Sequence, residues 1–329
     1  MHSSHLTLLS ACDSFPYPPS DLYEQHVSTY YHLRISSHPD TTLGYLLPSV
    51  ALTLSNLADW DVDSDTIPRT VTLVTGTNAA ERSLAIAKTT AAMKATGHWK
   101  VLDKWRGELY AVFGEGGEEV FRIERSASPL FGVVTYGIHL TAYTTSHPAS
   151  DSARRADDMK IWVPRRSRTK QTYPGMLDNT VAGGITAGEA PFESVVREAM
   201  EEASLPEELI RKRAKAAGCV TYFHIRDSRA GGETGLLQPE CQYVYDLDLT
   251  PGAGEEDVVC KPNDDEVETF ELLSVEEVLE ALGREEFKPN CAVVMIDFLV
   301  RHGIITRENE RDYIEICSRL HRRLEFPIG

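Results

Sequence analysis

The sequence has few cysteines, and no two of them lie close together. It contains six, spread along the chain: Cys12, Cys219, Cys241, Cys260, Cys291 and Cys317. Zinc sites and CxxC redox motifs need closely spaced cysteines, and a chain of 329 residues is too large to need a disulfide framework. We therefore expect reduced, mostly buried thiols in an intracellular protein.

Long apolar runs are also absent. No segment approaches the ~20 consecutive apolar residues that span a bilayer, and residues 1–19 include neither lysine nor arginine. A secretory signal and an Arg-rich transit peptide both need basic residues at that end. We expect a protein of the cytoplasm, or of the cytoplasm and the nucleus.

Positive charge is scarce. Lysine and arginine number 33 against 50 aspartates and glutamates, which gives a net charge of −17. Binding to nucleic acid regardless of its sequence, or to an anionic membrane surface, depends on positive charge. The net negative charge argues against nucleic acid and anionic membranes as partners. A metal ion held by acidic residues remains compatible with this charge, because a bound cation reverses the local field.

The remaining composition is that of a globular protein, with 42% hydrophobic and 25% charged residues. The length fits about two domains. We assign residues 1–125 to a smaller α+β accessory domain, whose role the sequence leaves open, and residues 126–329 to a second domain with C-terminal helices.

Local patterns predict several elements in the order of the chain. They are a helix over 43–57, a strand over 70–75, a helix over 78–96 capped by Asn78 and ended by Gly97, strands over 105–113 and 120–123 joined by a Gly-rich turn, a polar loop over 146–158 and a strand over 160–165.

A basic cluster follows that last strand: Arg165, Arg166, Arg168 and Lys170. In an acidic protein it is either a solvated loop or a set of side chains that reach phosphate groups. Because the cluster leads toward the motif described next, Arg166 and Lys170 are candidate substrate-binding residues. Asp178 has two interpretations, as a third such residue or as part of a turn.

Residues 183–205, GGITAGEAPFESVVREAMEEASL, combine a Gly-rich turn with an amphipathic helix. Pro191 suits the first helical turn. The apolar residues that repeat with helical spacing are Phe192, Val195, Val196, Ala199, Met200 and Ala203. Arg197 is spaced to pair with Glu193 or with Glu189.

Three carboxylates, Glu198, Glu201 and Glu202, share the other face of this helix. Like charges so close together cost stability unless cations sit among them. Hard oxygen ligands favour Mg²⁺ or Mn²⁺. The alternative is an ordinary solvated acidic face.

The spacing of Gly183, Glu189, Arg197 and the three carboxylates resembles the Nudix box, with Ser204 where the family has glycine. The resemblance implies a fold, an α/β/α sandwich with a mixed sheet. It also implies an activity, the cleavage of small-molecule diphosphates with the help of a divalent metal ion. It also implies the roles of individual residues. Metal ligands would be the Gly183 carbonyl with Glu198, Glu201 and Glu202; Glu198 and Glu202 would be essential for catalysis; Glu189 and Arg197 would be structural.

An additional glutamate from a later loop often serves as base or extra ligand in that family. Here Glu266 is our first choice and Glu268 the second, because both precede an apolar segment at 270–273. The alternative is a plain acidic loop.

Further motifs carry the resemblance across most of the chain: Trp105–Tyr110, Tyr173–Asn179, Lys288–Cys291 and Asp297–Gly303. Together they resemble the thiamine-pyrophosphokinase-related Nudix hydrolases of fungi and plants. The resemblance implies metabolite repair, in which thiamine diphosphate, and preferentially its oxo and oxy forms, is hydrolysed to the monophosphate and phosphate. With the chain ending at Gly329, we expect no kinase domain.

Two alternatives remain. One is a Nudix hydrolase for another diphosphate, such as a nucleoside diphosphate sugar. The other is a Nudix module without catalysis that senses a ligand. The oligomeric state is left open.

Overall fold

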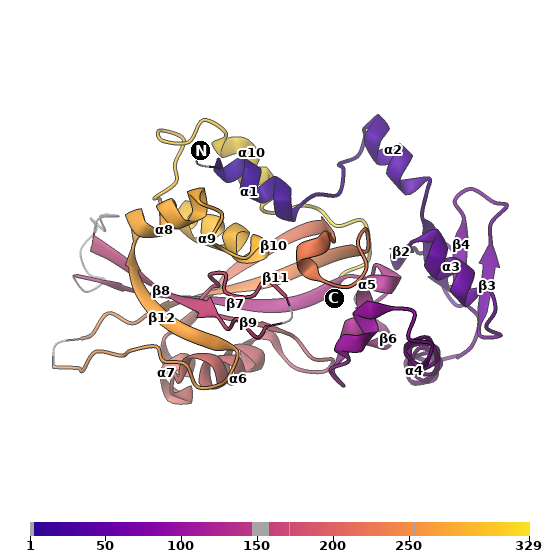
Figure 1. Cartoon of the computed structure of the whole chain (residues 1–329), viewed down its shortest axis with the longest axis horizontal. Helices are drawn as coiled ribbons and strands as arrows, with labels where there is room; N and C mark the ends of the chain where they lie inside the picture. Colours follow the sequence, from indigo (N-terminus) through magenta and orange to yellow (C-terminus); the bar gives the residue numbers. More distant parts are fainter. Residues whose placement is uncertain (1–2, 147–157, 171, 253) are drawn as a thin grey trace.

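The computed structural model describes residues 3–146, 158–170, 172–252 and 254–329, and shows two units side by side (Figure 1). The polar loop expected over 146–158 lies almost wholly outside the described residues. All six cysteines are unpaired and four of them are buried, as expected.

The N-terminal unit contains a four-stranded sheet in the order β2-β1-β4-β3 and a separate two-stranded hairpin. Its strands are β1 (Tyr31–Ile35), β2 (Gly44–Leu46), β3 (Trp60–Asp63), β4 (Thr70–Leu73), β5 (Leu109–Phe113) and β6 (Glu119–Glu124), and its helices are α2 (Asp21–Val27), α3 (Pro48–Leu54), α4 (Ala79–Ala95) and α5 (Ser128–Phe131). Between α4 and β5 lies the short 3₁₀ helix η1 (Lys100–Lys104).

Most local predictions for this unit are confirmed. The strand at 70, the hairpin and the long helix are present, and the Asn78 side chain accepts a hydrogen bond from the Glu81 backbone at 3.0 Å. The prediction of a helix over residues 43–57 is wrong for the first part of that segment. Residues 44–46 pair with β1 as a strand, and the helix begins only at Pro48, where proline at the first turn is favoured.

The second unit is a six-stranded mixed sheet between two layers of helices, which confirms the expected sandwich. Its strands are β7 (Thr135–Thr145), β8 (Met159–Arg166), β9 (Val181–Gly184), β10 (Ala214–Ile225), β11 (Leu237–Asp248) and β12 (Val267–Ser274), in the order β10-β11-β7-β8-β12 with β9 paired to β7. Only the β11–β7 pair is parallel.

Helices cover both faces of this sheet (Figure 1). On one face lie α6 (Pro191–Ala203) and α7 (Glu207–Arg213); on the other lie α8 (Val275–Gly283), α9 (Pro289–Arg301) and α10 (Tyr313–Arg319). Each face has its own apolar core, and α9 is buried almost along its whole length. Within the described residues, no helix is long and apolar enough to cross a membrane.

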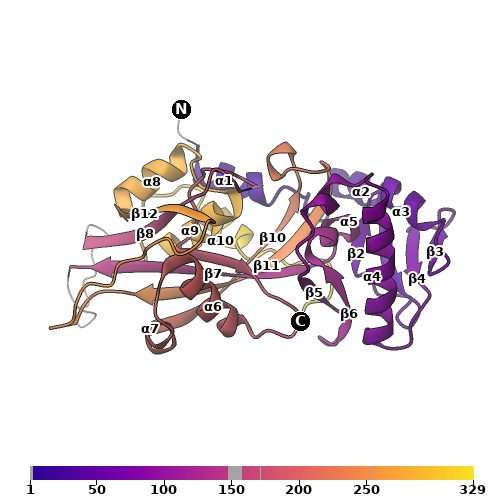
Figure 2. The same cartoon turned by 60° about the horizontal axis from the view of Figure 1, so that its bottom comes forward.

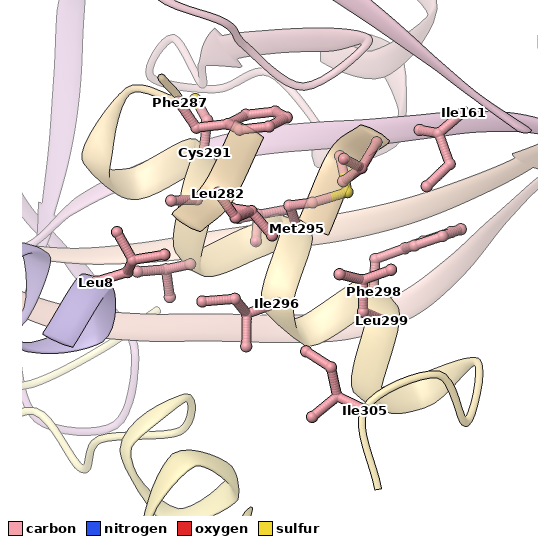
Figure 3. Close-up of a cluster of buried hydrophobic side chains, with 14 of the residues drawn as sticks. Leu8, Ile161, Leu282, Phe287, Cys291, Met295, Ile296, Phe298, Leu299 and Ile305 are labelled. Carbon is pink, nitrogen blue, oxygen red and sulfur yellow. The ribbon is translucent and has the colours of Figure 1, made fainter. Parts of the chain in front are cut away.

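The first helix, α1 (His5–Cys12), departs from the expected division at residue 125. It packs against α9 and α10 of the second unit and not against the N-terminal sheet. Figure 3 shows Leu8 within the same apolar cluster as Leu282 and Ile296. The short helix α5, at Ser128–Phe131, also departs from that division, because Leu130 and Phe131 belong to the core of the N-terminal unit. Otherwise the division between residues 1–125 and 126–329 stays a prediction.

Because Leu9 is 1% exposed in this cluster, Leu9→Ala should leave a cavity and destabilise the whole protein by about 2–5 kcal/mol. Leu22→Ala, on α2 with the side chain 55% exposed, should have little effect. Urea unfolding followed by circular dichroism measures both. Equal midpoints for the two variants would show that α1 is not part of the core.

Candidate active site

Helix α6 begins at Pro191 and ends at Ala203, as the sequence pattern predicts. Pro191 occupies its first turn, and the chain leaves it at Ser204 with a φ of 55°. Left-handed backbone of this kind is easiest for glycine. The Ser204 backbone N–H still bonds to the Ala199 carbonyl and closes the helix.

The apolar face of α6 lies on the sheet, as predicted, with one exception. Val195, Ala199 and Ala203 are fully buried, whereas Met200 is 43% exposed. The helix presents Glu202, and not Met200, to the protein interior. The Glu202 side chain is accordingly buried, with 9% of its surface exposed.

Arg197 holds the acidic residues around it. Its guanidinium binds both oxygens of Glu189, at 3.0 and 3.1 Å, and also Glu198 at 2.9 Å and Glu201 at 3.2 Å. Of the two pairings that the spacing allows, the fold selects Glu189. Glu193 pairs with Arg211 on the next helix, α7. The ion pair between Arg197 and Glu189 fixes the loop that joins β9 to α6.

Glu198 and Glu202 stand one helical turn apart and are poorly solvated. Burial, and then repulsion by Glu198 and Asp178, raises the pKa of Glu202 well above its usual value. Burial also raises the pKa of Glu198, although Arg197 opposes that shift. The Ala182 backbone N–H donates to Glu202 at 3.1 Å. No ion pair to Glu202 is present within the described part of the chain.

Strand β9 places two glycines against this site. A Cβ on Gly183 would overlap the Glu198 carboxylate, and a Cβ on Gly184 would overlap the Tyr110 hydroxyl. Any other residue at either position would displace a side chain of the site.

The pairing of β9 with β7 decides which backbone carbonyls face α6. Ile185 N–H bonds to the Tyr136 carbonyl, and Ile138 lies opposite Gly183 in the same antiparallel register. Hydrogen-bonded and open pairs alternate in such a ladder. Gly183 therefore turns its carbonyl toward β7, and Ala182, whose N–H reaches Glu202, turns its own polar groups away from β7.

The second acidic candidate, Glu266, lies close to Glu202. Both line one small cavity, together with Pro164, Arg166, Lys170, Asp178, Asn179 and Val267. Burial raises the pKa of Glu266, but the ion pair with Lys170 outweighs it and the pKa falls below its usual value. Glu268 instead lies near Arg168, at 3.6 Å, outside this cavity.

Arg166 and Asp178 are engaged with each other. Arg166 donates to the Asp178 carboxylate at 2.6 Å and also to the carbonyls of Thr172 and Tyr173. Asp178 also accepts from the Cys291 thiol. Burial opposes ionisation of Asp178, yet Arg166 and Lys288 hold its pKa well below the usual value. These contacts hold the segment before β9 in place and occupy much of the Arg166 guanidinium.

A larger cleft of about 260 Å³ lies between the two units. Its cationic lining residues are Lys104, Arg106, Arg125, Arg226 and Lys288, and Glu240 is the one carboxylate among its lining residues. Three of the motifs outside the box line it, through Arg106 and Tyr110, through Tyr173 and through Lys288. The charge of this cleft was missed at the sequence level, although the motifs that form it were found.

Two known protein families match parts of this chain. Residues 145–291 match the NUDIX domain family, and residues 35–135 match a domain of unknown function, DUF4743.

Residues 145–291 form a Nudix domain.

The chain also has relatives that match about two thirds to three quarters of its length. It is 45% identical over 227 residues to an uncharacterized protein of Saccharomyces cerevisiae, a match that covers 68% of this chain and 63% of the yeast protein. It is 35% identical over 245 residues to Nudix hydrolase 20 of Arabidopsis thaliana, named chloroplastic, with 74% and 59% covered. The matches thus span about three fifths of these curated relatives.

A crystal structure of a Deinococcus radiodurans protein is also similar, with 20% identity and a TM-score of 0.37. The alignment covers 55% of this chain and 91% of that one.

The donors of the Nudix domain suit a divalent metal ion. Carboxylate oxygens on one helix are the ligands that Mg²⁺ and Mn²⁺ prefer, and buried Glu202 lacks a cationic partner among the described residues. Across the described ranges, no three histidine, cysteine or acidic side chains already converge as a metal centre. The Arg197 guanidinium donates to both Glu198 and Glu201.

The raised pKa of Glu202 predicts how stability depends on pH in the metal-free protein. The folded state holds this proton more tightly than the unfolded chain, so stability falls as pH rises from the unfolded pKa through the folded one. Glu202→Gln removes this penalty. With chelator present, it should raise Tm more at about pH 8 than at about pH 5.

Glu193→Gln is the control on the same helix. The ion pair with Arg211 lowers the pKa of Glu193, so no gain at high pH is expected. Thermal unfolding across the pH range measures both variants. A gain for Glu202→Gln that does not depend on pH would contradict the burial of an ionised carboxylate.

Proposed function

We propose that this chain is a Nudix hydrolase that cleaves the diphosphate of a small molecule, with Mg²⁺ or Mn²⁺ held by Glu198, Glu201 and Glu202. The observation that carries the proposal is the pair of poorly solvated, repelling carboxylates on α6, beside a cleft whose charged lining residues are mostly cationic. Repulsion that costs stability in the empty protein becomes favourable when divalent cations bind. Bound cations would neutralise the diphosphate and lower the pKa of the attacking water.

The protein's own residues would position this chemistry. The bidentate pair of Arg197 with Glu189 holds Glu198 at the end of β9. A backbone carbonyl of β9 is the further ligand that the sequence assigned to Gly183. The ladder favours Ala182 for this role, because its polar groups face α6.

Glu266 would be the base or an additional ligand. It shares a cavity with Glu202, and Lys170 keeps it ionised near neutral pH. An ionised carboxylate is ready both to accept a proton from water and to bind a cation. Lys170 and Arg166, the proposed substrate-binding cations, already pair with Glu266 and Asp178. We therefore infer that they act on the substrate mainly by orienting these carboxylates.

Glu198→Gln and Glu202→Gln should each lower turnover by roughly 10²–10⁴-fold, because a metal ligand or an aligned water is lost. Mg²⁺ should raise the Tm of the parent protein, since ions bind the folded carboxylates and not the unfolded chain. That rise should shrink in both variants. Glu193→Gln, on the same helix, serves as the control for both readouts.

Parent-like turnover in both glutamine variants would contradict the metal-site assignment. Mg²⁺-dependent stabilisation that vanishes with the carboxylates, without phosphate release from any diphosphate, would identify a ligand-sensing module.

For the substrate, we propose thiamine diphosphate-like compounds, with preference for the oxo and oxy forms, as the resemblance implies. Two features of the cleft support this. Its volume of about 260 Å³ lies at the small end of ligand pockets, which favours a compact group over a nucleoside diphosphate sugar. Its charged lining residues are cationic apart from Glu240, which disfavours the cationic thiazolium of intact thiamine relative to the uncharged oxo ring.

Polar groups on β10 and β11 could recognise an added oxygen. The His224 Nε2 atom is buried and has no hydrogen-bond partner among the described residues, and Gln242 lies on the next strand. A satisfied hydrogen bond to a new carbonyl or hydroxyl is worth about 1–3 kcal/mol, or roughly 5- to 150-fold in kcat/KM.

The oxo and oxy forms should therefore have a higher kcat/KM than intact thiamine diphosphate. The measurement is a parallel comparison with an ADP-sugar as the competing class. A higher value for the ADP-sugar would reject the thiamine assignment and leave diphosphate hydrolysis standing.

A further inference from the structure

The N-terminal unit, which has no assigned role, forms one wall of the cleft. Figures 1 and 2 show the β5–β6 hairpin between the large sheet and the rest of this unit. We propose that this unit completes the substrate site, with Arg106 and Arg125 binding the phosphate groups of a diphosphate. The proposal rests on the proposed function for the identity of the anion, but it concerns binding and not cleavage.

The hairpin docks directly on the loop that carries the Nudix motif. The Ala187 backbone N–H donates to the Leu109 carbonyl at 2.7 Å. The Tyr110 hydroxyl fills the space that a side chain at position 184 would take. Gly184 is therefore required by a residue of the other unit, and the motif loop is shaped to receive the hairpin.

A buried carboxylate fixes the segment that bears Arg106. Glu124 is 3% exposed and accepts from the backbone N–H groups of Arg106, at 2.8 Å, and Gly107, at 3.1 Å. The same carboxylate accepts from the Ser126 hydroxyl. This arrangement clamps both chain segments from which Arg106 and Arg125 project.

The two guanidinium groups differ in how they are held. Arg125 pairs with Glu108 at 2.8 Å and lies 5.7 Å from the centre of the Tyr110 ring. The Arg106 guanidinium makes no ion pair within the described part of the chain, although the protein carries a net charge of −17. Arg106 thus combines a guanidinium without an ion-pair partner and a backbone that Glu124 holds in place. Such a residue is preorganised to bind an anion.

Electrostatics connects these cations to the acidic residues of the Nudix domain. Burial raises the pKa of Glu266, whereas Lys170, Arg106 and Arg125 lower it. The Arg125 guanidinium also interacts with Glu198 across the boundary between the units. A diphosphate between the two sets would contact guanidinium groups on one side and metal-bound carboxylates on the other. Arginine suits this role because its planar fork matches phosphate oxygens.

The test uses the full chain without metal and inorganic pyrophosphate as the probe, with binding measured by calorimetry. Arg106→Gln and Arg125→Gln should each weaken binding by roughly 10- to 100-fold, because a charge-assisted hydrogen bond is lost. Arg106→Lys should restore part of it. Lys88→Gln, an exposed position on α4 of the same unit, removes the same charge away from the cleft and should change binding less than about twofold.

Equal affinities for Arg106→Gln and Lys88→Gln would overturn the proposal, and so would the absence of binding to the parent chain at millimolar pyrophosphate. Arg106 is exposed, so its variant should fold even where Arg125→Gln does not, and circular dichroism checks this. In hydrolysis assays with Mg²⁺, Arg106→Gln should raise KM more than it lowers kcat. Arg106-dependent binding without any hydrolysis by the parent protein would support this proposal while rejecting the proposed function.

Discussion

The rest of the site depends on two poorly solvated carboxylates, half-buried Glu198 and buried Glu202, which lie one helical turn apart on α6. Like charges in a poorly solvated place repel each other, and the fold accommodates them with few cations. Arg197 balances Glu198 from one side, and a backbone N–H of β9 balances Glu202 from the other. Glycine at position 183 leaves the room that Glu198 needs. Helix α6 and strand β9 therefore both contribute groups that contact Glu198 or Glu202. The loop between them joins the same network, because Glu189 accepts from Arg197.

The same arrangement explains why the second unit is not the whole site. Strand β9 carries glycines on both of its faces, one against Glu198 and the other against Tyr110 of the N-terminal hairpin. The strand thus contacts the acidic helix through one glycine and the N-terminal hairpin through the next, and both glycines also line the cleft. The charged residues that line the cleft are five cations and Glu240. This excess of positive charge in the cleft of an acidic protein makes the cleft attractive to an anion.

Predictions from sequence succeeded where the interactions are local. The Asn78 cap, the helix that follows it and the β5–β6 hairpin depend on residues a few positions apart, and all three are present. The helix expected over 43–57 failed in its first part, because those residues pair with β1, whose position only the tertiary fold supplies. For the same reason, α1 could not be placed on the C-terminal helices.

The sequence by itself determined the motif helix, its three carboxylates and the class of metal they suit, because helical periodicity alone brings residues three and four apart to one face. Only the tertiary structure decided that Arg197 pairs with Glu189, that Glu266 reaches the cavity of Glu202, and that Arg106 lines the same cleft as Gly183. These relations join segments far apart in the chain. Their distances follow from how sheets and helices pack, and no local spacing encodes them.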